Sequence, residues 1–198
     1  MTEWEKLQNG WIYNDFDPDL FQRRVEAKKL FRAYNRTDDD ETEKRQEIMT
    51  SLFKNIGRNV WIEPDFRCEF GKNITIEDDV YINFGCIILD CAEVTIGSHT
   101  LIGPNVGLYP VNHLTDAEER IHGGCYGKPI HIGKNVWIGG DVKILAGVSI
   151  GDNTIIGTGS IVTKDVPASV IAVGNPCKVI KQITEKDKTD YLRSIGVM

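Results

Sequence analysis

The chain has 198 residues, 41% of them hydrophobic and 26% charged, which suits one domain with a small appendage and excludes two large domains. No apolar run predicts a membrane span or a signal peptide, and the net charge of -6 disfavours nucleic acid as a partner. The five cysteines are sparse and form no C-x-x-C pair, so we expect a reduced, cytoplasmic protein without a structural metal.

Residues 1–55 are predicted to form a helical segment. Asp17 followed by Pro18 is a typical helix start, and apolar residues at helical spacing continue to about Arg36. A second helix is expected over residues 40–55, ending before Gly57. The apolar positions of the two helices are Leu20, Ala27, Phe31 and Tyr34 in the first, and Ile48, Met49, Leu52 and Phe53 in the second.

Residues 56–183 carry a six-residue repeat of aliphatic side chains. This period fits neither the 3.6 residues of a helix nor the two of a long strand, so each unit must contain a turn. The repeat is Ile132, Ile138, Ile144, Ile150, Ile156 and Val162, with Ile96, Ile102 and Leu108 in the same phase. A shifted phase contains Ile56, Ile62, Cys68, Ile74, Val80 and Cys86. We expect a coil of short parallel strands.

Each repeat unit also suggests which side chains face inward. Small or β-branched residues precede the repeat positions by two residues, so both sets share a face, and Trp137, Lys143 and Ile155 point outward. We expect the sharp corners to use the positive φ angles that Gly, Asn and Asp tolerate. The corner candidates are Gly97, Gly103, Gly133, Gly139, Gly151, Gly157, Asn135, Asp141 and Asn153.

Two segments depart from the repeat. Residues 109–128 contain Pro110, adjacent glycines and several charges, so we expect a loop that leaves the coil, as functional loops often do. Residues 184–198 begin with Thr184-Glu-Lys-Asp187, a capping-box pattern that predicts a short terminal helix. We expect this helix to cap the open end of the coil.

The repeat and several local motifs resemble the hexapeptide-repeat acyltransferases, and among them the sugar O-acetyltransferases typified by maltose and galactoside acetyltransferases. The resemblance covers nearly the whole chain and implies a mainly β fold. In this fold a left-handed parallel β-helix follows the helical segment, and the molecule is a homotrimer. The motifs are Tyr13-Asn14-Asp15, Tyr34-Asn35, Asn83-Phe84, Asn112-His113, Asn135-Val136-Trp137-Ile138-Gly139, Val162-Thr163-Lys164-Asp165 and Gly174-Asn175-Pro176.

His113 matches the histidine that this family uses as a general base. A hydroxyl is a poor nucleophile until a base removes its proton, and an imidazole can do this near neutral pH and return the proton to the leaving thiolate. The other histidines, His99, His122 and His131, are expected to face solvent. Their spacing matches no familiar zinc motif, which disfavours a zinc carbonic anhydrase, the other well-known enzyme type on this coil.

The resemblance also implies acceptor contacts. Asp15, Arg24 and Asn83 match positions that hold sugar hydroxyls, and Tyr81 and Asp90 lie close to Asn83 in the sequence. Galactoside-type members have a second acidic residue just after the position of Asp90. Cys91 stands there in this chain and favours the maltose type.

Acetyl-coenzyme A is the cosubstrate that the resemblance implies, lying along the C-terminal coils. Lys164, Lys178 and Lys181 would pair with its phosphates. Trp137 would cover the pantetheine arm or pack against a neighbouring subunit, and the Gly140 N–H would donate to the thioester oxygen as it becomes an oxyanion. Asn83 and Thr163 complete the implied coenzyme contacts.

The sequence therefore predicts a cytoplasmic O-acetyltransferase that acts by direct attack of a sugar hydroxyl on acetyl-CoA. Cys125 is the only thiol near His113 in the sequence, and nothing in the pattern activates it as a nucleophile. Two alternatives remain open. The acceptor could be an amino sugar or an antibiotic, or the chain could be a catalytically silent β-helix scaffold.

Overall fold

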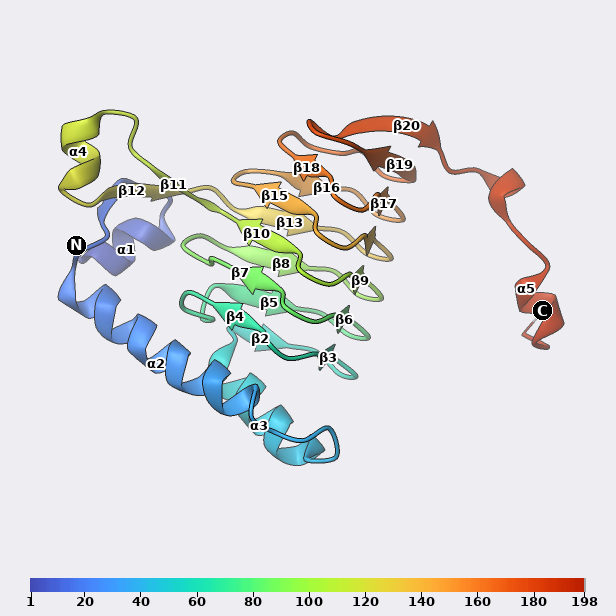
Figure 1. The fold of residues 1–198 in the computed structure, drawn as a ribbon, viewed down its shortest axis with the longest axis horizontal. Coiled ribbons are helices and arrows are strands. Elements are labelled where there is room, and N and C mark those ends of the chain that lie inside the picture. Colours follow the sequence, from blue (N-terminus) through green and yellow to red (C-terminus); the bar gives the residue numbers. More distant parts are fainter. Residues whose placement is uncertain (198) are drawn as a thin grey trace.

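The computed structural model describes residues 1–197 and is organised around a coil of short parallel strands (Figure 1). The coil has three sheets, and consecutive strands pass from one sheet to the next. The first sheet contains β2 (Asn55–Ile56), β5 (Ile74–Ile76), β8 (Val94–Ile96), β13 (Ile130–Ile132) and β16 (Ser149–Ile150). The predicted mainly β, parallel β-helix is confirmed.

The other two sheets complete each turn of the coil. The second contains β3 (Trp61–Ile62), β6 (Tyr81–Ile82), β9 (Leu101–Ile102), β14 (Trp137–Ile138), β17 (Ile155–Ile156), β19 (Val170–Val173) and β20 (Lys178–Gln182). The third contains β4 (Arg67–Cys68), β7 (Ile87–Ile88), β10 (Gly107–Tyr109), β15 (Lys143–Leu145) and β18 (Ile161–Val162). Each of these strands except β20 contributes apolar side chains to a common core.

The strand register corrects the predicted phase of the first block. Ile56 pairs with Ile76 and Ile62 with Ile82, so Ile74 and Val80 do not continue the phase of Ile56. They lie two positions earlier and are also buried. The corner between β4 and β5 is two residues longer than a regular repeat, and this insertion moves the phase.

The corners use asparagine and aspartate for positive φ angles, as predicted, but not the glycines that follow the isoleucines. Asn135 and Asp141 have φ angles of 55° and 59°. Gly97 and Gly139 instead lie where a Cβ atom would come within 2.6 Å of the backbone of the next coil. These glycines are needed because stacked coils approach each other closely, so the prediction of positive φ at them is wrong.

The N-terminal residues form three helices and one short strand: α1 (Glu3–Gln8), β1 (Tyr13–Asn14), α2 (Pro18–Tyr34) and α3 (Thr42–Leu52). α1 was not expected from the sequence, although Thr2 and Glu5 form a capping box at its start. Phe31 of α2 and Met49 of α3 join the core of the coil, and Figure 1 shows these helices beside its first turn. The observed helices end two or three residues earlier than predicted.

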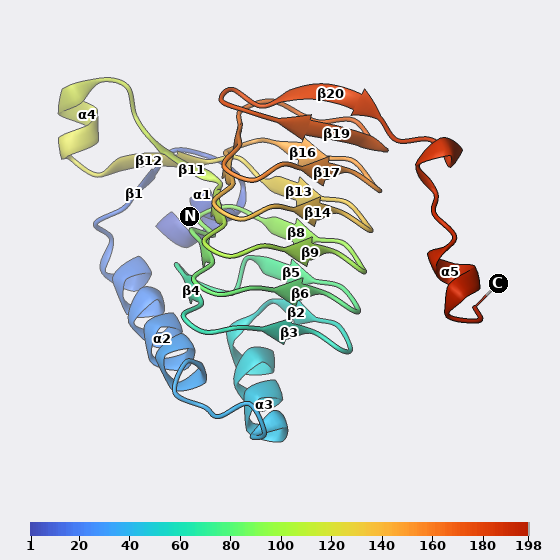
Figure 2. The same cartoon turned by 45° about the vertical axis from the view of Figure 1, so that its right-hand side comes forward.

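Residues 109–128 form an ordered hairpin that projects from the coil (Figures 1 and 2). Its elements are β11 (Val111–His113), α4 (Ala117–Ile121) and β12 (Gly124–Gly127). β12 pairs antiparallel with β11 on one side and with β1 on the other, giving a separate three-stranded sheet. The hairpin is therefore tied to the N-terminal segment.

The C-terminal residues do not form the expected cap. The capping box at Thr184 opens only a 3₁₀ turn (Glu185–Asp187), and the last helix is the short α5 (Tyr191–Ser194). Both figures show α5 standing away from the coil, and its residues are exposed. The final strand β20 instead folds back antiparallel along β19. None of the helices within residues 1–197 is long and apolar enough to cross a membrane.

Candidate functional site

The three-stranded sheet brings His113 next to a buried thiol. Cys125 of β12 lies in register between His113 of β11 and Tyr13 of β1. His113 is exposed, and its Nδ1 atom lies 3.0 Å from the Cys125 Sγ atom. This pairing was not predicted from the sequence, because the register of the hairpin cannot be read from the two positions alone.

Cys125 is nearly inaccessible, with 1% of its surface exposed. Burial is the main cause that raises the pKa of its thiol to about 11, and the nearby Asp15 carboxylate adds to this effect. The thiol is therefore protonated near neutral pH. Its sulfur can accept a hydrogen bond from the imidazole Nδ1–H, but the residue has little thiolate with which to attack. Beside it, the buried Tyr13 hydroxyl has no hydrogen-bond partner among residues 1–197.

Asp15 and Arg24, two predicted acceptor contacts, lie together beside this sheet. The Asp15 N–H donates to the Gly123 carbonyl at 2.8 Å, which ties Asp15 to the hairpin. The half-buried Asp15 carboxylate pairs with the guanidinium of Arg24, which also pairs with Glu69. Arg24 is thus oriented by two carboxylates, and Glu69 was not identified from the sequence.

Asp90 does not contact the acceptor side, so that prediction is wrong. Its side chain is completely buried, and its oxygens accept from the N–H groups of Glu69, Phe70 and Asn73 at 2.8 to 3.2 Å. Burial raises its pKa to about 6, although these amides oppose the rise. Asp90 instead holds the corner over residues 69–73 and so positions Glu69.

Asn83 and Gly140 lie along another edge of the coil, where the second sheet turns into the third. Successive corners there are stacked by backbone hydrogen bonds from Asn105 to Phe84 (2.8 Å) and from Gly159 to Gly140 (2.9 Å). Figure 1 shows the hairpin at the left of the coil and β3, β6 and β9 at the right. One chain therefore does not bring Asn83 to His113.

Tyr81 and several predicted coenzyme contacts lie on the surface of the coil, and none of them lines the cavity described below. Tyr81 is half-buried and donates to Glu63 at 3.1 Å. Trp137 is 54% exposed and faces outward, as the strand alternation predicts. The remaining residues are exposed: Thr163 and Lys164 follow β18, whereas Lys178 and Lys181 lie on β20, and Lys181 pairs with Asp187.

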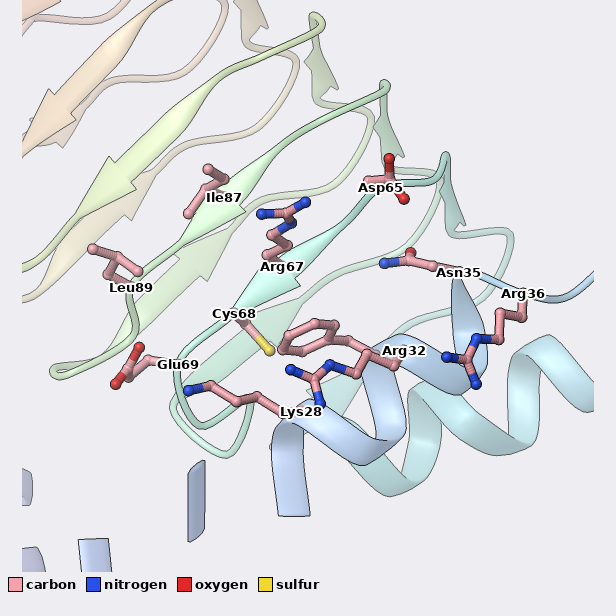
Figure 3. A pocket seen from close by; sticks show the side chains of 11 residues that line it. Lys28, Arg32, Asn35, Arg36, Asp65, Arg67, Cys68, Glu69, Ile87 and Leu89 are labelled. Carbon is pink, nitrogen blue, oxygen red and sulfur yellow. The ribbon is translucent and has the colours of Figure 1, made fainter. Parts of the chain in front are cut away.

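A cavity of about 550 Å³ lies between α2 and the third sheet (Figure 3). None of the predicted site residues lines it, but Glu69 does, and Glu69 connects it to Arg24. Lys28 and Arg32 could have indicated it, because residues spaced by four share one face of a helix. Residues 1–197 contain no group of three or more His, Cys, Asp or Glu side chains that could hold a metal ion.

Comparisons with known proteins show similarity to acetyltransferases along almost the whole chain. Residues 6–57 match the maltose acetyltransferase hexapeptide capping motif, and residues 129–164 match the bacterial transferase hexapeptide with six repeats. A galactoside O-acetyltransferase of Escherichia coli is 42% identical over 193 residues, covering 98% of this chain and 95% of the relative.

Two solved structures have the same fold at high similarity. A maltose O-acetyltransferase from Clostridium difficile superposes with a TM-score of 0.91 and 46% identity, covering 93% of this chain and 99% of the other. A galactoside acetyltransferase in complex with coenzyme A has a TM-score of 0.91 and 42% identity, covering 96% of each chain.

Proposed function

The chain belongs to the hexapeptide-repeat sugar O-acetyltransferases that include the maltose and galactoside enzymes, and from this membership we propose a mechanism built on His113. The protein is an acyltransferase that moves an acetyl group from acetyl-CoA to a sugar. The observation that carries the mechanism is the exposed imidazole of His113, whose Nδ1 atom is held by the buried thiol of Cys125.

His113 acts as general base through its second nitrogen. Because Nδ1 faces Cys125, Nε2 is the nitrogen left for an acceptor. Nε2 takes the proton of the sugar hydroxyl as the hydroxyl oxygen attacks the thioester carbon. The tetrahedral intermediate then collapses, the bond from carbon to sulfur breaks, and the imidazolium returns the proton to the coenzyme A thiolate. A direct attack of this kind needs no acyl-enzyme, and the protonated state of Cys125 supports that assignment.

The acceptor is held by Asp15 and Arg24 beside His113, and by Tyr81 and Asn83 from the other edge. The ion pairs with Glu69 and Asp15 support this role for Arg24 because they orient its planar guanidinium. A sugar needs several such partners, since each buried hydroxyl left unpaired costs about 1 to 3 kcal/mol.

Acetyl-CoA lies along the C-terminal coils. Lys164, Lys178 and Lys181 pair with its phosphates, and the exposed ring of Trp137 covers the pantetheine arm. The Gly140 N–H donates to the developing oxyanion of the thioester. Asn83 and Thr163 make the remaining polar contacts with the coenzyme.

The active molecule is a homotrimer with sites between subunits. His113 and Asn83 lie on different edges of one coil, so a second copy must complete the site (Figure 1). An outward column of large side chains on the second sheet supports close contact between copies, because a monomer would leave it in water. In register, the column is Trp61, Tyr81, Leu101, Trp137, Ile155 and Ile171.

Among neutral sugars the acceptor is of the maltose type, and the setting is cytoplasmic. Cys91 is buried beside Tyr13 and supplies no carboxylate to the acceptor, which favours the maltose type over the galactoside type. All five cysteines are free, which supports a reducing compartment. An amino sugar or an antibiotic remains the second candidate acceptor.

A thiol-release assay with acetyl-CoA tests the function over a panel of sugars. Maltose, glucose, galactosides, glucosamine and an aminoglycoside antibiotic would be compared at equal concentration. We expect release with neutral sugars, and acetyl ester at a hydroxyl when the product is isolated. Release only with amines would favour the second candidate acceptor, and no release with any acceptor would favour a silent scaffold.

A further inference from the structure

Four cations around the cavity of Figure 3 have no ion-pair partner within the part of the chain that the structure describes. Lys28 and Arg32 lie on one face of α2, Arg36 lies in the turn just after α2, and Arg67 lies on β4 across the cavity (Figure 3). No carboxylate of residues 1–197 comes within 4.0 Å of any of these four side chains.

The cluster lies in a chain of opposite net charge. The net charge of the chain is -6, and other basic side chains of the N-terminal segment, such as Arg23 and Lys44, are paired with carboxylates. Lys28 and Arg32 are like charges four residues apart on α2 and repel each other, although the position of Arg32 in the last turn is favourable for a cation. Of the two carboxylates that line the cavity, Glu69 is already paired with Arg24.

The walls of the cavity suit a small molecule with one apolar face and one anionic group. Phe31, Ile87 and Leu89 supply apolar surface, and the volume of about 550 Å³ is typical of small-ligand sites. Arginine binds phosphate or carboxylate through paired N–H groups, and Arg32 and Arg67 lie on opposite walls. The side chain of Asn35 forms hydrogen bonds with the backbone N–H and carbonyl of Phe66, which hold it in place at the wall of the cavity.

We propose that this cavity binds the phosphate or carboxylate group of an anionic sugar and extends the acceptor site. Glu69 belongs to the cavity wall and to the chain of ion pairs that reaches Asp15, so the cavity adjoins the acceptor side. The identification of this sugar as an acceptor rests on the proposed function, whereas the binding of an anion does not.

Calorimetric titration of the full-length protein without acetyl-CoA tests the binding. The probes are inorganic phosphate, glucose 6-phosphate, glucuronate and glucose, with chloride matching the ionic strength. We expect phosphate to bind, and at least one anionic sugar to bind more tightly than both phosphate and glucose. The stronger of glucose 6-phosphate and glucuronate identifies the anionic group.

Variants locate the bound anion. Arg32→Gln and Arg67→Gln should each weaken phosphate binding at least about tenfold, because each removes a charge-assisted contact. Lys29→Gln is the matched control, since Lys29 is an exposed cation of α2 outside the cavity. Equal losses in all three variants, or no phosphate binding by the wild type, would overturn the site. Loss of the oligomer in Arg32→Gln or Arg67→Gln, measured by light scattering, would assign these cations to subunit contact and also overturn it.

Kinetics separate this proposal from the proposed function. We expect a higher kcat/KM for the preferred anionic sugar than for glucose, and Arg67→Gln should raise the KM of the anionic sugar alone. Anion binding without acetylation of any sugar would contradict the proposed function and leave the anion site standing. Acetylation of glucose without anion binding would overturn the anion site and leave the function standing.

Discussion

At the scale of single residues, His113 and Cys125 face each other across the hairpin with unequal access to solvent. The imidazole is exposed, and the thiol beneath it is buried and protonated near neutral pH. A proton acceptor must reach its substrate, whereas a group that only orients it can lie underneath. This difference in access supports the proposed roles of His113 as base and Cys125 as positioning group.

Replacing His113 by alanine should lower kcat by roughly 10²- to 10⁴-fold, the usual range for loss of a general base. The fold should persist, because the side chain is exposed on the hairpin and outside the core of the coil. Initial rates of thiol release and circular dichroism check both statements. Retention of more than about a tenth of the wild-type kcat would reject His113 as the base.

Replacing Cys125 distinguishes positioning from nucleophilic catalysis. Cys125→Ala should lower kcat by roughly 3- to 10-fold, the effect of one neutral hydrogen bond, and leave the KM for acetyl-CoA unchanged. Cys125→Ser should keep more activity, because its hydroxyl can still bond the imidazole. Nitrogen NMR of the His113 ring, with the proton expected on Nδ1, gives a readout independent of turnover. Complete loss of activity in Cys125→Ser would point to a nucleophile instead.

At the scale of structural elements, the corner over residues 69–73 connects a buried carboxylate to the acceptor side. The Asp90 carboxyl group accepts hydrogen bonds from three backbone N–H groups of this corner, and one of these N–H groups belongs to Glu69. Glu69 then pairs with Arg24 of α2, which pairs with Asp15 after β1. The coil thus orients residues of the N-terminal segment through one corner.

Asp90 should make the stability of the protein depend on pH. Its pKa is raised from 3.8 to about 6 by burial, so folding favours the protonated carboxyl. The resulting stabilisation is fully present below about pH 4 and is lost as the pH rises through about 6, a change on the order of 3 kcal/mol. The neutral Asp90→Asn variant lacks this dependence. It should be less stable overall, because its amide group cannot accept from Asn73.

Urea unfolding at fixed protein concentration checks the effect of Asp90. The difference in unfolding free energy between wild type and Asp90→Asn should shrink between about pH 4 and pH 6. Thr158→Ala serves as a control, since Thr158 is an exposed coil residue far along the sequence from this corner. A difference that stays constant with pH would show that Asp90 is ionised throughout this range.

At the scale of the whole molecule, the coil separates the proposed base from part of its substrate contacts. The hairpin with His113 projects from one edge, and the corner with Asn83 lies on another (Figure 1). A rigid stack of coils cannot bend to close this separation within one chain. A rotational arrangement of copies would bring the edge of one subunit to the hairpin of the next.

Mixed assemblies should therefore regain activity that each parent lacks. His113→Ala and Asn83→Ala subunits, unfolded together at equal amounts and refolded, should recover up to about a quarter of the wild-type activity, because about one site in four then combines intact residues from both neighbours. Each variant refolded alone is the control. Light scattering should give three times the mass of one chain. No recovery in mixed trimers would place both residues in one subunit's site.

The sequence by itself determined the repeat, the inward set of side chains and the identity of His113 as the residue to examine. These follow from local rules, because a six-residue period must turn in every unit and a family motif is carried by adjacent residues. Asn135 and Asp141 show the same locality, since a positive φ angle depends mainly on the residue that adopts it. The apolar spacing of α2 is local in the same way.

Only the tertiary structure decided which residues meet across long sequence distances. The contact of His113 with Cys125 depends on a hairpin register, and the buried role of Asp90 depends on the corner that folds over it. The glycines after the isoleucines depend on the distance between stacked coils, and the last strand of the coil pairs with β20, whereas α5 stays exposed. Such outcomes are set by packing between segments that are distant in the sequence. Patterns within one segment carry no information about that packing.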